Sequence, residues 1–167
     1  MYHEETIAFA WAVPSPTPNA DIQARFQHIA EIMVSAFHRL GIDALIGEVP
    51  GEYCPGQFSV NTRGKKKLMG VGQRLVSRAA HIGGVVVAGG STRIRDILLP
   101  VYDALGIAWD PDSVGSLEDE MAGVRYEDAQ RAVVDEFASR YELVNASVSK
   151  DTLTLAEAVE PSYAISY

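Results

Sequence analysis

The sequence predicts an α+β fold, a mostly antiparallel sheet with helices packed on it, in one domain that spans residues 1–167. The length of 167 residues suits a single hydrophobic core. Hydrophobic residues make up 47% and charged residues 22%, as in globular domains. Two neighbouring strand patterns and three amphipathic stretches occur in an order that favours an antiparallel sheet with helices over a βαβ alternation.

The N-terminal third is predicted to form a strand, a long helix and a short strand. Thr6–Val13 is mostly apolar, which is typical of a buried strand. Asn19 is a suitable N-cap for a helix that reaches Leu40, and Gly41 is a suitable C-cap. A stripe of apolar side chains at spacings of three and four gives that helix one core face: Ile22, Phe26, Ile29, Met33, Phe37 and Leu40. A short strand over 42–49 follows.

The middle of the chain is predicted to form the rest of the sheet. Gln57–Asn61 has a strand pattern, and Thr62–Gly64 a turn pattern. Leu68–Arg78 and Ile82–Ala88 are expected to pair as antiparallel strands joined near His81. Gly70 and Gly72 interrupt the first of these two strands, and glycines inside a strand usually mark a bulge or a close approach to the backbone.

Two further helices are predicted after the sheet. Ser91 or Thr92 caps a helix that ends at Leu105, with Pro100 bending it and Gly106 stopping it. Residues 108–119 are expected to form a loop. A last clear helix extends from about Tyr126 to Tyr141, and the pattern after Ser147 is ambiguous.

Composition excludes several classes of protein. No apolar run approaches 18 residues, so no membrane span is expected, and the N-terminus has no signal-peptide pattern. The single cysteine excludes an internal disulfide framework, and a cytoplasmic location is expected. No metal site is expected, because the four histidines are scattered along the chain and a surface or core role suits them better.

Charge is distributed unevenly along the chain. The net charge is −8, yet the stretch from Tyr53 to Arg95 holds eight basic residues and no acidic one. This stretch has two interpretations, a local site for an anionic ligand or a solvated strand edge protected by lysines. A nucleic-acid surface is a weaker third interpretation, because Tyr53 and Phe58 are the only large aromatic residues there.

Cys54 and Lys67 are the residues whose chemistry suggests a reaction. A thiol near cationic groups can act as a nucleophile, although a small buried hydrophobic role is common for a free cysteine. Lys67 opens a strand beside Gly70 and Gly72, where a ligand can approach the backbone. A lysine at such a place suits a phosphate or a mixed carboxyl–phosphate anhydride.

These residues lie in a pattern that resembles the lipoate–protein ligase A family of the biotin/lipoate ligase superfamily. The pattern is Cys54-Pro55-Gly56, a short strand, and then the sequence GKKKLMGVGQR over residues 64–74. The stretch DPDSVGSL over residues 110–117 is also similar to the family. Met1-Tyr2-His3-Glu4 resembles the end of the family's glycine-rich motif, so the resemblance covers the part of a catalytic domain that is C-terminal to that motif.

The resemblance implies transfer of a lipoyl or octanoyl group to a lysine of a lipoyl-domain protein. The acyl group would come from an acyl-adenylate made with ATP, with or without Mg²⁺, or from an acyl carrier. Lys67 corresponds to the family's ligand-contacting lysine, with Lys66 as the alternative, and Cys54 to the thioester-forming cysteine of its amidotransferase branch. The other residues implied in substrate binding are His3, Ser59, Gly70, Gly72, Gln73 and Arg74.

Two departures from the family pattern change these expectations. Ser59 stands where the family usually has Asp, and the chain starts where the glycine-rich segment would have ended. We therefore expect a catalytic domain truncated at its N-terminus, with an unpaired sheet edge beside Thr6–Val13 that a homodimer or a complementary N-terminal chain covers. The alternative is a non-catalytic subunit or remnant that keeps the fold and binds a partner chain or an acyl ligand.

Overall fold

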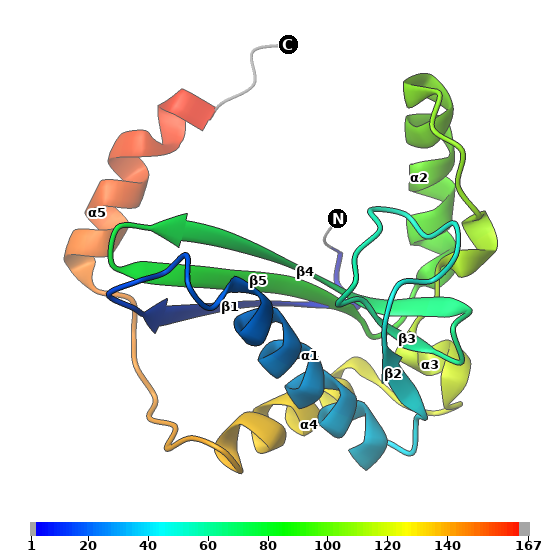
Figure 1. Ribbon diagram of the computed structural model, residues 1–167, viewed down its shortest axis with the longest axis horizontal. Coiled ribbons are helices and arrows are strands. Elements are labelled where there is room, and N and C mark those ends of the chain that lie inside the picture. Colours follow the sequence, from blue (N-terminus) through cyan, green and yellow to red (C-terminus); the bar gives the residue numbers. More distant parts are fainter. Residues whose placement is uncertain (1–2, 164–167) are drawn as a thin grey trace.

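The computed structural model describes residues 3–163 and contains one five-stranded sheet with the strand order β1-β5-β4-β3-β2. Every pair of neighbouring strands is antiparallel, which confirms the predicted α+β class. The three long strands form a twisted platform, and the two short strands extend it at one end (Figure 1). The strands are β1 Thr6–Pro14, β2 Ala44–Ile46, β3 Val60–Thr62, β4 Lys66–Val76 and β5 Ala79–Val87.

The helices lie on both sides of this sheet. The long helix α1 and the helix α4 cover one face, whereas α2 stands at the other side near the short strands (Figure 1). The helices are α1 Ile22–Arg39, α2 Ser91–Leu105, α3 Leu117–Glu120, α4 Tyr126–Ala138 and α5 Lys150–Val159, with 3-10 turns η1 Pro111–Ser113 and η2 Glu160–Tyr163.

The main core lies between the sheet and the two helices α1 and α4. Ile29, Met33 and Phe37 of α1 are fully buried, as the apolar stripe predicted. Ile22 and Phe26 of the same stripe are half-buried. A second, smaller cluster on the opposite side joins Val87 of β5 to Ile94 of α2 and to Val114. Because α2 packs on this second cluster, it closes one side of a space above the sheet.

The predicted start of α1 is wrong by two residues. Its N-cap is Asp21 rather than Asn19. The backbone N–H of Ala20 donates to the Thr17 carbonyl, and an Nη of Arg25 donates to the Pro18 carbonyl. The segment after the prolines therefore closes as a turn before the helix begins. Gly41 follows the helix with φ +79°, the left-handed conformation expected there.

Several strand boundaries also differ from the prediction. The strand predicted over 42–49 is confined to β2, and the strand predicted over Gln57–Asn61 begins only at Val60 and includes Thr62. Ser77 and Arg78 form the turn between β4 and β5, so His81 lies within β5. The turn lies earlier in the chain than predicted, because the pairing between β4 and β5 continues as far as Val76 and Ala79. The apolar alternation in the sequence fades before that point.

The predictions for the C-terminal half need smaller corrections. Gly90, with φ +67°, occupies the N-cap of α2 in place of a hydroxyl side chain. The predicted loop over 108–119 contains η1 and the start of α3, which Asp110 and Ser116 cap with their side chains. The helix α4 ends at Ala138, three residues before Tyr141.

A bulge at the start of β4 decides which residues face the space above the sheet. Val60 of β3 pairs with Met69, but the next residue, Asn61, pairs with Lys67. Leu68 and its neighbour Met69 are consequently both buried in the main core. The bulge puts Lys67 on the same side as Gly70, which a strict alternation would not do.

The strand β1 is at the edge of the sheet among the residues described, with β5 as its one strand neighbour. This agrees with the predicted open edge beside Thr6–Val13. Its residues Ala8, Ala10 and Ala12 are exposed, whereas Phe9 and Trp11 are packed against the core. An edge strand with small exposed side chains and no lysine is a template for pairing with another strand.

We predict that the purified chain associates through β1 and that Ala10→Lys converts it to a monomer, because lysine on an edge strand opposes pairing. The mass in solution, measured by light scattering, tests this. Ala104→Lys on the exposed surface of α2 adds the same charge elsewhere and is expected to leave the assembly intact. A monomeric wild-type chain would contradict the prediction.

Candidate functional site

A cleft of about 700 Å³ lies above the sheet, on the side opposite α4. Its walls come from β4 and β5, from α2, from the first turns of α1 and from residues 53–59. The segment 52–59 is here called the cysteine loop. Most of the lining is apolar, and it includes Phe26 stacked on Phe58 with ring centroids 5.4 Å apart. A flexible, mostly apolar ligand fits such a space.

Glycines from two neighbouring strands form the floor of the cleft. Gly70 and Gly72 of β4 face it together with Gly83 and Val85 of β5, which are their antiparallel neighbours. Neither Gly70 nor Gly72 has a positive φ, so the backbone does not require glycine at either position. A Cβ at Gly72 would have no heavy atom within 4 Å, whereas one at Gly70 would lie 3.2 Å from Cε of Lys67. The missing side chains leave room for a ligand rather than for another part of the fold.

Lys67 places a positive charge at one end of this floor. The residue is only 2% exposed, although it lines the cleft. Its Nζ donates to the carbonyl oxygens of Cys54 at 2.7 Å and Tyr53 at 3.0 Å, and it lies 3.4 Å from Oε1 of Glu52. The ammonium is also 4.9 Å from the centre of the Tyr53 ring. The cysteine loop therefore wraps around this one cation.

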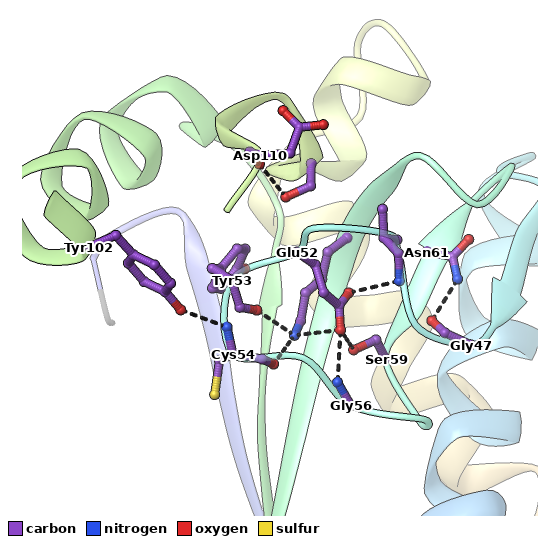
Figure 2. Close-up of polar contacts among 12 residues, drawn as sticks. Gly47, Glu52, Tyr53, Cys54, Gly56, Ser59, Asn61, Tyr102 and Asp110 are labelled. Atoms are coloured by element: carbon purple, nitrogen blue, oxygen red, sulfur yellow. Dashed lines mark hydrogen bonds and ion pairs between the residues drawn. The ribbon is translucent and has the colours of Figure 1, made fainter. Parts of the chain in front are cut away.

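Cys54 lies in the same loop with its backbone held from both sides. Its N–H donates to Oη of Tyr102 at 2.8 Å, and its carbonyl accepts from Lys67. Its φ of +46° is unusual for a residue other than glycine and costs about 1–2 kcal/mol. The side chain is exposed, and the sulfur points away from the hydrogen-bond network in Figure 2. The position excludes the alternative of a small buried hydrophobe.

Glu52 joins the cysteine loop to the sheet. Its carboxylate accepts hydrogen bonds from the N–H of Gly56 at 2.9 Å and from Oγ of Ser59 at 2.7 Å (Figure 2). It also accepts from the N–H of Val49 at 3.2 Å. Ser59 is thus a hydrogen-bond partner of Glu52 at the edge of the cleft, where the family pattern would have a second carboxylate.

Aromatic residues close the end of the cleft beside α2. Tyr53 and Tyr102 both contact Trp109, with ring centroids 6.4 and 4.9 Å apart. Burial, and then the negative charge of Glu52, raise the pKa of Tyr53 above its usual value. Its phenol is therefore neutral at physiological pH, and its ring presents an uncharged face to the ammonium.

Three of the predicted site residues lie elsewhere. Gln73 points to the opposite face of the sheet, where its amide accepts from Arg25 and donates to the Ile22 carbonyl. Arg74 is exposed and does not line the cleft. His3 also lies outside the lining, next to Gly90. The structure thus brings together Lys67, Cys54, Ser59, Gly70 and Gly72.

Glu52 and Tyr102, which hold the cysteine loop, were not predicted from the sequence. Glu52 directly precedes the stretch without acidic residues, and that position was the one available signal. Tyr102 is 48 residues from Cys54 in the chain and carried no signal, because it follows only from how α2 packs.

The sequence matches the lipoyl protein ligase A/B catalytic domain over residues 1–138. The chain belongs to that family. Lys67 and Cys54 both fall within the matched range, whereas α5 lies outside it. No curated protein matches the chain.

Solved structures with the same fold are lipoate ligases and related proteins. Protein Ta0514 from T. acidophilum with bound lipoic acid has a TM-score of 0.73 at 18% identity, over 95% of this chain and 62% of its own. A lipoate-protein ligase A bound with ATP has a TM-score of 0.72 at 18% identity, over 93% and 60%. A bipartite lipoate protein ligase from Thermoplasma acidophilum, studied with its E2 lipoyl domain, has a TM-score of 0.71 at 16% identity, over 93% and 60%.

These likenesses establish the fold of the family for the described part of the chain. The chain spans about 60% of the length of the solved structures. Within residues 3–163, no helix is long and apolar enough to cross a membrane. No group of three or more His, Cys, Asp or Glu side chains in the same range is arranged to hold a metal ion.

Proposed function

We propose that the protein transfers a lipoyl or octanoyl group to a lysine of a lipoyl-domain protein. The observation that carries the proposal is the joint position of Lys67 and Cys54 at one end of an apolar cleft with a glycine floor. The cleft suits a medium-length acyl chain, and the buried ammonium suits the oxygen of its activated carboxyl group.

In the carrier-dependent route, the Cys54 thiolate attacks the carbonyl carbon of an acyl-carrier thioester. A new C–S bond forms to Cys54, the C–S bond to the carrier breaks, and the carrier leaves as a thiolate. The amine of the acceptor lysine then attacks the Cys54 thioester, an amide forms, and Cys54 is released as a thiol that takes the proton lost by the amine. The Lys67 ammonium stabilises the negative charge on the carbonyl oxygen in both steps.

In the ATP-dependent route, ATP supplies an acyl-adenylate and the acceptor amine displaces AMP. The residues that support it are Lys67, which would lie against the anhydride, and Gly70 and Gly72, which let the acyl chain approach the backbone. A Mg²⁺ ion would accompany the nucleotide phosphates. The exposed sulfur of Cys54 at the cleft leads us to favour the carrier-dependent route for this chain.

The proposed partners are the acyl donor, a lipoyl-domain acceptor and a second chain that pairs with β1. The open edge of β1 supports the second chain, either another copy or a complementary ligase chain like that of the bipartite ligase. We place the reaction in the cytoplasm, because a nucleophilic thiol needs a reducing compartment.

The second candidate is a non-catalytic subunit that binds a partner chain or an acyl ligand. The bonding of Lys67 favours it, because the ammonium already has three protein partners and leaves no donor plainly free for a ligand. The following experiments separate the two candidates.

The first prediction concerns Lys67. Lys67→Ala and Lys67→Arg are both expected to abolish acyl transfer in an assay where the wild-type protein is active. The planar guanidinium is too bulky for the space in which the ammonium touches two carbonyls. Transfer of octanoate to a lipoyl-domain protein is the measurement, and circular dichroism checks the fold. Full activity in either variant would remove Lys67 from the mechanism and make Lys66 the next candidate.

The second prediction concerns Cys54. Incubation with an octanoyl-carrier thioester is expected to add one octanoyl group to the wild-type chain, seen in the intact mass, and none to Cys54→Ser. Cys54 is the only cysteine, so another thiol cannot accept the group. We expect this chain alone to catalyse no ATP-dependent ligation. Such ligation without a thioester would refute the carrier-dependent route.

The third prediction concerns the length of the acyl chain. Gly72→Val adds an isopropyl group at a place where a Cβ has no heavy atom within 4 Å, so the fold is kept and the cleft is shortened. Thioester formation with an octanoyl donor is expected to slow at least about tenfold, and with an acetyl donor less than about threefold. Ala12→Val on the exposed side of β1 creates the same isopropyl side chain outside the cleft and serves as the control. Equal effects on both donors would contradict the assignment of the floor.

A further inference from the structure

Glu52 takes part in no step of the proposed reaction, yet it is the most completely bonded side chain near the site. Its side chain has no exposed surface, and it does not line the cleft. Its two carboxylate oxygens meet Val49, Gly56, Ser59 and Lys67. A carboxylate buried in this way is costly unless every partner is in place, so its position is strongly specified.

The partners of Glu52 belong to three different parts of the chain. Val49 precedes the cysteine loop, Gly56 and Ser59 belong to its second half, and Lys67 belongs to β4. The carboxylate therefore fixes both halves of the loop to the strand that carries the ammonium. Figure 2 shows these contacts converging between the loop and the strands.

The strained conformation of Cys54 depends on the same contacts. The Cys54 carbonyl is bonded to Lys67, which in turn is paired with Glu52. A residue with φ +46° keeps that conformation only where its surroundings over-determine it. Loss of the Glu52 charge leaves the buried Lys67 ammonium without a counter-ion. An amide nitrogen in place of a carboxylate oxygen also removes an acceptor, either from Val49 or from Gly56 and Ser59.

We propose that Glu52 is a positioning residue that holds the thiol of Cys54 and the ammonium of Lys67 in the relative placement that acyl transfer needs. The inference rests on the proposed function, but it goes beyond it by assigning a role to a side chain that touches no substrate. Misplacement of reacting groups by about 1 Å costs on the order of a hundredfold in rate, so the role has a measurable size.

The experiment compares Glu52→Gln with Glu136→Gln. Glu136 is a matched control, because it is also buried and ion-paired, with Arg39 and Arg140 on the α4 side of the molecule. Two rates are measured on each variant at saturating donor, namely octanoyl-thioester formation at Cys54 and alkylation of Cys54 by iodoacetamide. Alkylation needs an accessible thiol but no positioned carbonyl, so a merely structural effect does not separate the two rates.

We expect Glu52→Gln to slow thioester formation at least about tenfold and to change alkylation less than about twofold. Glu136→Gln is expected to leave both rates unchanged per folded molecule. Wild-type thioester formation in Glu52→Gln, or a parallel loss of both rates in the two variants, would overturn the proposal. If Glu52→Gln does not fold, Glu52→Asp takes its place, because it keeps the charge but cannot reach all four partners. Thioester formation is then expected to fall at least about threefold. The wild-type rate in Glu52→Asp would overturn the proposal.

Thioester formation by the wild-type protein tells a failure of the proposed function apart from a failure of the role proposed for Glu52. If it forms no thioester, acyl transfer through Cys54 is refuted, and hydrogen exchange then decides the role of Glu52. Loss of protection at the amides of Cys54 and Gly56 in Glu52→Gln, but not in Glu136→Gln, would support a loop held in place by Glu52. Retained protection at both amides would refute it.

Discussion

The buried ammonium of Lys67 is the interaction on which the arrangement of the cleft depends. An isolated ammonium is very costly to bury, and removal of one partner of a buried ion pair costs about 3–5 kcal/mol. Two backbone carbonyls and Glu52 surround this ammonium, and all three come from residues 52–54. The cation thus fixes the path of the cysteine loop, and the loop in turn forms one wall of the cleft.

The bulge on β4 and the glycines beyond it serve the same arrangement. A regular strand would turn Lys67 toward the main core, where no carbonyl or carboxylate could receive it. The bulge turns two apolar residues, Leu68 and Met69, into the core instead and brings Lys67 onto the face of Gly70. Glycines weaken a strand, yet the floor that they form is the surface along which the proposed acyl ligand would reach the ammonium. The sheet therefore gives up local stability at the place where the site needs room.

The elements and site residues that the sequence predicts are those specified by neighbours close in the chain. The strands β1, β4 and β5 and the helix α1 were predicted because alternation and 3.6-residue periodicity are local signals. Lys67, Cys54 and the two glycines of β4 were predicted because their chemistry and spacing are visible within 20 residues. Gln73 was expected to bind substrate, but it points to the face of the sheet opposite the cleft, where it holds Arg25. Only the three-dimensional pairing reveals that partner, as it reveals the bond between Tyr102 and Cys54.

The stretch from Tyr53 to Arg95, which has no acidic residue, is neither wholly a site for an anionic ligand nor a solvated strand edge protected by lysines. Four of its eight basic side chains pair with carboxylates from outside the stretch, Arg63 with Glu120, Lys67 with Glu52, Arg93 with Glu4 and Arg95 with Asp112. Half of the basic side chains of this stretch are thus matched by carboxylates of other elements when the chain folds. Lys67 is the one basic side chain among the described residues that lines the cleft. One ammonium at the end of an apolar floor favours a ligand with a single carboxyl-derived group on a hydrocarbon chain over a highly charged ligand. It also fixes the orientation of such a ligand in the cleft, because the polar end can bind only beside Cys54.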